Sequence, residues 1–72
     1  MKIYLIMPPS NYGTVRAFTT MKAAREALRK MAKEIGENSC WKPKVFRWKG
    51  GNLCFMNKDG GLYMIEEAEL EE

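Results

Sequence analysis

The chain has 72 residues, 46% of them hydrophobic and 29% charged, which is the composition of one small globular domain spanning 1–72. No apolar run approaches the ~18 residues of a membrane span, and the first apolar stretch is shorter than the core of a signal peptide. We therefore expect a mature cytoplasmic protein that makes no membrane contact. In that compartment Cys40 and Cys54 are expected to be reduced thiols, with Cys54 acting as a small hydrophobic residue.

Charge is divided unevenly along the chain. All twelve Lys and Arg precede residue 59, and only four acidic residues accompany them before residue 66, which gives residues 1–65 a balance of +8. The last seven residues, EEAELEE, hold five glutamates and lower the net charge to +3. We interpret 66–72 as the solvated acidic end of a strand with a frayed tail. A basic body with an acidic end bears on partners and solubility rather than on the fold.

The chain opens with two predicted strands. Residues 2–7 (KIYLIM) are rich in β-branched and aromatic residues, as strands are. Residues 8–13 (PPSNYG) have the composition of a turn. Residues 14–18 predict a second strand that returns antiparallel to the first.

A helix over 21–35 is the clearest local prediction, because this segment consists almost entirely of strong helix formers. Thr20 is a suitable N-cap and Gly36 is the predicted stop. The apolar residues follow helical spacing along one face, which predicts a buried stripe. Its members are Ala24, Ala27, Leu28, Met31 and Ile35.

Three further strands are predicted over 41–49, 52–57 and 61–70. The Gly50-Gly51 pair and the segment 57–60 (NKDG) separate them, and both are typical hairpin turns. The order of elements is therefore ββαβββ. It predicts the α+β class, with a single antiparallel sheet of four to five strands and one helix packed on one face.

The predicted sheet is wider than its helix. Five strands span roughly 20 Å at a spacing of ~4.8 Å, whereas a helix with its side chains is about 10–12 Å across. The first and last strands nevertheless carry apolar residues on both faces. We therefore expect an apolar patch that a partner protein or a second copy of the chain covers, a homodimer in the latter case. A sheet that curls on itself is the alternative.

The helix also carries a basic stripe. Four like charges on one line suit the phosphates of a nucleic acid or an acidic protein surface. A solvated helix face is the alternative, because charged residues most often face water. The stripe residues are Lys22, Arg25, Arg29 and Lys33.

The segment 40–55 (CWKPKVFRWKGGNLCF) mixes rings with basic side chains. Strand alternation over 41–49 predicts that Phe46 and Trp48 form a core pair. The candidate partner-binding residues Val45, Arg47 and Lys49 then lie on the open face of the sheet. A stacking platform for single-stranded nucleic acid is the alternative interpretation.

Catalysis is not expected. The chain has no histidine, so it offers no Ser-His or Cys-His pair and no zinc site. Its glycine-rich turns do not lead from a strand into a helix, as a phosphate-binding loop would. We expect neither a metal nor a cofactor.

Several segments resemble a loose family of short proteins encoded by bacteriophages and prophages. Such chains begin with a KxYLV-like strand, place a Phe-Ser/Thr-Ser/Thr cap before an Ala-rich helix, and end in an acidic strand. The resemblance covers about half of the chain and implies an accessory protein of anti-CRISPR type, which blocks a host or defence machine by binding it. The matching residues are Phe18, Thr19, Thr20, Ala23, Ala27 and 65–67.

We therefore hypothesise a small non-enzymatic protein that binds a larger host or defence protein complex as a phage-encoded inhibitor in the host cytoplasm. The alternative hypothesis is a nucleic-acid-binding module that uses the basic helix stripe and the basic, aromatic hairpin.

Overall fold

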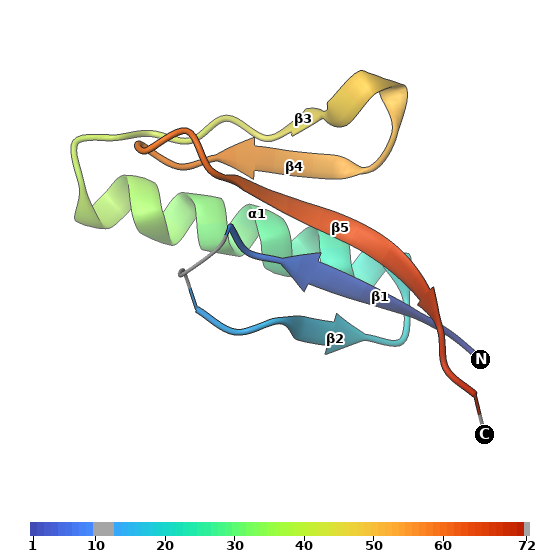
Figure 1. Ribbon diagram of the computed structural model, residues 1–72. Helices are drawn as coiled ribbons and strands as arrows, with labels where there is room; N and C mark the ends of the chain where they lie inside the picture. Colours follow the sequence, from blue (N-terminus) through green and yellow to red (C-terminus); the bar gives the residue numbers. More distant parts are fainter. Residues whose placement is uncertain (10–12, 72) are drawn as a thin grey trace.

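One helix lies across one face of a five-stranded antiparallel sheet in the computed structural model, which describes residues 1–9 and 13–71 (Figure 1). The predicted α+β class is confirmed. The sheet order is β2-β1-β5-β4-β3, and every neighbouring pair is antiparallel. Part of the predicted turn over 8–13, residues 10–12, lies outside the described residues. The elements are β1 (Lys2–Met7), β2 (Arg16–Phe18), α1 (Met21–Asn38), β3 (Phe46–Arg47), β4 (Leu53–Met56) and β5 (Leu62–Glu69).

The core lies between α1 and the sheet. The helix contributes Ala24, Leu28 and Ala32, all buried, and its predicted stripe residues Ala27, Met31 and Ile35 pack around them. Two alanines at the centre of this face let the helix approach the strands closely. From the sheet, the fully buried members of the core are Ile6, Leu53, Phe55 and Ile65. No helix in the described part of the chain combines the length and hydropathy that a membrane crossing requires.

Helix α1 ends three residues later than predicted. Gly36 lies inside the helix, which continues to Asn38. The last carbonyls find local donors: Asn38 Nδ2 donates to Glu34 O at 2.9 Å, and Ser39 Oγ donates to Ile35 O at 2.8 Å. Side-chain capping therefore ends the helix, and a glycine stop is not needed.

The prediction of a strand over 41–49 is wrong for most of its length. Only Phe46–Arg47 pairs with β4, opposite Cys54 and Leu53. Residues 41–45 run beside β4 without pairing, and Met56 O, the acceptor that a longer β3 would use, accepts from Trp41 Nε1 instead. The short 3₁₀ turn η1 (Trp48–Gly50) then follows β3 directly.

The two sides of this segment are also reversed relative to the prediction. Val45 packs against the core, whereas Phe46 and Trp48 are each 39% exposed. Arg47 pairs with Leu53, a core residue, so it shares the helix side of the sheet rather than the open face. Lys49 lies in the turn. The predicted inward pair Phe46 and Trp48, and the predicted open-face set, are therefore both wrong.

The turn between β3 and β4 is displaced by one residue. Its central residues are Lys49 and Gly50, with φ angles of 49° and 76°, and the Gly51 N–H donates to Trp48 O at 2.8 Å. Two consecutive positive φ angles are typical of a type I′ turn, which matches the twist of a hairpin. Lys49 thus takes a left-handed conformation that glycine would take more readily.

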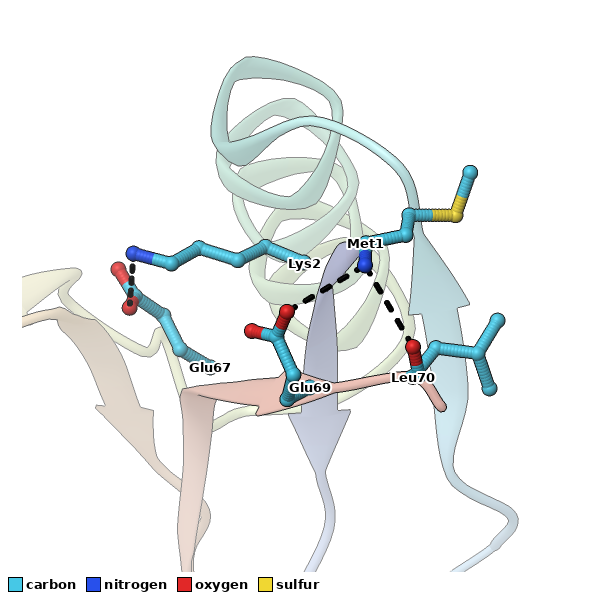
Figure 2. A network of polar contacts seen from close by, with 5 residues as sticks. All are labelled: Met1, Lys2, Glu67, Glu69 and Leu70. Carbon is cyan, nitrogen blue, oxygen red and sulfur yellow. Dashed lines mark hydrogen bonds and ion pairs between the residues drawn. The ribbon is translucent and has the colours of Figure 1, made fainter. Parts of the chain in front are cut away.

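The acidic end of the chain is paired rather than frayed through residue 69. Glu69 is in register with Lys2, and the Leu70 N–H donates to Met1 O at 2.8 Å. Two exposed ion pairs join the same strands: Met1 N to Glu69 Oε1 at 3.3 Å and Lys2 Nζ to Glu67 Oε2 at 3.9 Å (Figure 2). The strand predicted over 61–70, with a solvated acidic end, agrees with β5 (Leu62–Glu69) to within one residue at each end, and Glu66, Glu67 and Glu69 are exposed.

The N-cap of α1 gives a first prediction. Thr20 Oγ1 accepts a hydrogen bond from the Ala23 N–H at 3.1 Å, so Thr20→Ala leaves that N–H without its partner. We expect a loss of about 1 kcal/mol in the free energy of unfolding, measured by urea denaturation. Thr19→Ala is the matched control, with an expected change within about 0.5 kcal/mol. Equal losses in both variants would contradict the capping role.

Candidate functional site

The face of the sheet opposite α1 is apolar and has no element over it among the described residues (Figure 1). Strand alternation assigns its members, because Tyr4, Ile6, Phe55, Tyr63 and Ile65 occupy the helix side. We call this surface the open face. It is formed by Ile3, Leu5, Met7, Ala17, Phe46, Cys54, Met56, Leu62, Met64, Glu66 and Ala68.

Only one charged side chain, Glu66, belongs to the open face within the described chain. It lies opposite Leu5 on β1, two residues beyond Met64 on β5. The other side chains of the face are those of a protein interior, yet Phe46 and Met56 are 39% and 38% exposed. A contiguous apolar surface with this composition is uncommon on a monomeric protein and usually marks a contact surface.

Cys54 is the one fully buried residue of the open face. Its cross-strand partners Phe46 and Met64 flank it on the neighbouring strands. Burial raises the pKa of the Cys54 thiol, and a backbone hydrogen bond from Trp48 offsets part of that rise. The thiol is therefore neutral and acts as a small apolar group, as the sequence predicts. Cys40 is exposed, and neither cysteine is in a disulfide.

The predicted helix stripe lies on the other side of the molecule. Ala24, Leu28 and Ala32 face the sheet, so the stripe flanks or opposes that buried face. Three of its members, Lys22, Arg29 and Lys33, are exposed, whereas Arg25 is half-buried.

The structure therefore does not bring the predicted partner-binding residues together. The stripe lies on α1, whereas the hairpin residues lie at the β3 edge of the sheet and do not share one surface. Val45 is in the core, and Arg47 Nη1 donates to Gly51 O at 3.1 Å within the β3–β4 turn. Lys49 Nζ lies 5.6 Å from the ring centroid of Trp48.

Trp41, which the sequence reasoning did not select, occupies a special position at the edge of the sheet. Its Nε1–H donates to Met56 O at 2.9 Å. The Asn57 N–H of the same peptide unit donates to Gly61 O on the β5 side, so the Met56 carbonyl points toward the β3 edge. The indole thus satisfies a carbonyl that a longer β3 would have paired.

Two hollows meet at the Trp41 ring. One, of about 210 Å³, lies at the end of α1 and is lined by Ile35, Ser39, Trp41, Asn57, Lys58, Asp59 and Tyr63. The other, of about 310 Å³, lies where the α1–β3 connection meets the open face, and we call it the Trp41 groove. It is lined by Trp41, Lys42, Lys44, Phe46 and Met56.

The Trp41 groove combines apolar walls with positive charge. Phe46 and Met56 belong to the open face, so the groove is continuous with it. Lys42 and Lys44 are exposed, and no ion pair involving either is found within the described residues. The signal for this site in the sequence is Pro43, because a proline is confined to edge or unpaired positions of a sheet and strand alternation does not place the side chains around it.

The rings near the groove do not form a stacking surface. The Phe46 and Trp48 ring planes are tilted by 59° with centroids 6.4 Å apart, and Lys49 lies beside Trp48. The parallel ring pair in the described chain, Phe55 and Tyr63 at 4.6 Å, lies on the helix side of the sheet.

Within the described residues, no three His, Cys, Asp or Glu side chains group closely enough to hold a metal ion. No protein-family model, curated protein or solved structure matches this chain. Evidence for function therefore comes from two features of the protein, the open face and the Trp41 groove.

The anchoring of Trp41 can be tested by removing its N–H alone. We expect Trp41→Phe to lower the free energy of unfolding by about 1 kcal/mol, because the Met56 carbonyl loses its donor. Trp48→Phe is the control, since Trp48 is similarly exposed (39% against 40%). Urea denaturation measures both variants, and a loss no larger in Trp41→Phe than in Trp48→Phe would contradict the anchor.

Thiol labelling tests the burial of Cys54. The thiolate is the reactive form of cysteine, and burial both raises the Cys54 pKa and excludes reagent. As the pH rises from 7 to 9, we expect iodoacetamide to add one label, at Cys40, while Cys54 reacts only after unfolding in urea. Mass spectrometry counts the labels. Two labels added at similar rates to the native protein would show that the open face does not shield Cys54.

Proposed function

We propose that this protein is a non-enzymatic binding protein that docks on another protein through the open face. The single observation that carries the proposal is the continuous apolar surface on the side of the sheet that α1 does not cover. Burying such a surface yields about 25 cal/mol per Å² of apolar area. A partner gains this energy without any rearrangement of the sheet, because the strands are already paired.

The size of the face suits a protein partner. β5 has eight residues and is about 27 Å long at ~3.4 Å per residue, and five strands are roughly 20 Å wide. Because β2 and β3 have only three and two residues, the flat area of the strands is about 400 Å², which suits a small protein contact rather than a standard interface of ~800 Å² per partner. Small ligands need a concave site instead.

The class of partner follows from the resemblance to short phage-encoded proteins. We propose a larger host or defence protein complex as the partner, inhibition by occupancy as the mode of action, and the host cytoplasm as the place. A basic body supports association with an acidic surface, since complementary charge accelerates encounter.

Nucleic-acid binding is the competing proposal, and the four-residue helix stripe favours it. The stripe lies on α1, on the covered side of the sheet, whereas Phe46 lies on the open face, and Glu66 lies among the apolar residues of that face. Phosphates and bases of one strand would therefore not meet both. A salt titration with single-stranded and duplex DNA and RNA separates the two proposals: affinity tighter than micromolar at ~0.15 M salt, with a steep salt dependence, would favour nucleic acid.

Charge placed at the centre of the open face tests the protein-binding proposal. Leu5→Lys and Met64→Lys remove apolar area, and each lysine lies near Glu66, so both variants are expected to fold. We expect each to reduce capture of partners from a host lysate, and to reduce inhibition of the host or defence function, by at least about tenfold. Quantitative mass spectrometry of affinity-purified material is the measurement.

The control changes charge on the other side of the molecule. Arg29→Glu and Lys33→Glu alter exposed stripe residues that the open face does not contain, and partner capture is expected to persist. Capture that survives Leu5→Lys and Met64→Lys but fails in the stripe variants would assign the interface to α1 and overturn the proposal.

A further inference from the structure

We infer that the Trp41 groove binds an extended acidic segment of the partner protein, with one large apolar side chain inserted between Trp41, Phe46 and Met56. This inference rests on the proposed function and deepens it, since it assigns the chemistry of one part of the partner.

The walls of the groove favour an apolar side chain. Trp41, Phe46 and Met56 line the groove and are each 38–40% exposed, so part of each side chain faces the hollow instead of the core. A ring and a thioether together make an adaptable apolar site. The Trp41 ring is held in place by its bond to Met56 O, so the groove is largely formed before anything binds, which lowers the ordering cost.

Lys42 and Lys44 favour a bound segment with negative charge. Lys42 and Lys44 border the groove, no acidic residue lines it, and neither lysine is paired within the described chain. The first hollow differs here, because Lys58 and Asp59 both line it. Of these two hollows, the Trp41 groove presents an apolar floor with charge of one sign at its edge, which is complementary to Asp or Glu residues flanking an apolar side chain.

A peptide suits the groove better than single-stranded nucleic acid. The Phe46 and Trp48 rings are tilted by 59°, so these two rings offer successive bases no parallel faces. Two cations also provide fewer phosphate contacts than a strand-tracking surface uses.

The acidic end of the same chain is poorly placed to fill the groove. Glu67 and Glu69 are engaged with Lys2 and the Met1 ammonium, while the Leu70 side chain points away from this network (Figure 2). Both termini also lie at the opposite end of the sheet from the start of the α1–β3 connection (Figure 1). An occupant from a separate protein avoids breaking these contacts.

The test uses three synthetic heptapeptides and the full chain. The probe is fluorescein-labelled Glu-Glu-Asp-Phe-Asp-Glu-Glu, measured by fluorescence polarisation. One control peptide has Ser in place of Phe, and the other has Lys at every acidic position. We expect the probe to bind at least about tenfold more tightly than the Ser peptide, since the Phe side chain buries apolar surface in the groove, and we expect no binding of the basic peptide.

Matched double variants locate the site. We expect Lys42→Glu with Lys44→Glu to weaken probe binding at least about tenfold, and Arg29→Glu with Lys33→Glu to change it by no more than about twofold. The net charge changes equally in the two pairs, and all four side chains are exposed, so folding, checked by circular dichroism, is expected to persist. In a Trp48→Phe background, the remaining tryptophan fluorescence reports Trp41 directly and is expected to shift when unlabelled probe binds.

Several results would overturn the inference. They are equal binding of the probe and the Ser peptide, equal losses in the two double variants, or displacement of the probe by a ten-residue oligouridine at lower concentration than by unlabelled probe. Concentration-dependent self-association in sedimentation equilibrium that Lys42→Glu with Lys44→Glu abolishes would assign the groove to a second copy instead. If the probe fails to bind while Leu5→Lys still abolishes partner capture, the proposed function stands and this inference falls.

Discussion

A sheet has two faces, and this protein has one helix with which to cover them. Every strand except the short β2 and β3 carries large apolar residues on both sides, and α1 buries only the side that contains Ile6, Phe55 and Ile65. The hydrophobic effect that holds α1 in place is equally available on the open face, where nothing in the described chain uses it. All five strands are paired while apolar surface on one face of the sheet stays uncovered, and this imbalance motivates the proposed function.

The sequence predicts this uncovered apolar surface, because the prediction needs only the number of strands and helices and the apolar pattern of the strands. Strand number, helix number and two-sided patterning follow from composition and turn signals, none of which needs an exact boundary. Details that depend on register were less predictable. Strand alternation assigned Phe46 to the core and Val45 to the open face, and the structure reverses both. Residues 41–45 do not pair with β4, so alternation counted from residue 41 has no physical basis.

The candidate site was missed for the same reason. Strand alternation over 41–49 treats Trp41 as an ordinary strand residue. In the structure its indole N–H donates to the Met56 carbonyl at the edge of β4, in place of the backbone hydrogen bond that a longer β3 would make. A sequence pattern assigns faces but does not reveal which side chain compensates for a strand that stops early. The helix stripe shows the converse case: its spacing was predicted correctly, yet spacing on one element carries no information about the distance to another. The sheet lies between the stripe on α1 and Phe46 on the open face, and no spacing within α1 predicts this.

At the edge of the sheet formed by β3, the same residues protect the backbone from strand pairing and shape the Trp41 groove. An unpaired edge exposes backbone groups that invite uncontrolled strand pairing, and Trp41 and Pro43 together close this one. Trp41 occupies the Met56 carbonyl, and Pro43 offers no N–H to an incoming strand. Closing the edge in this way also lifts residues 41–44 off the ladder, which creates the groove beside Phe46 and leaves Lys42 and Lys44 free at its border. Protection of the edge and the shape of the Trp41 groove therefore depend on the same two residues, so a substitution at either position is expected to act on stability and on the proposed recognition together.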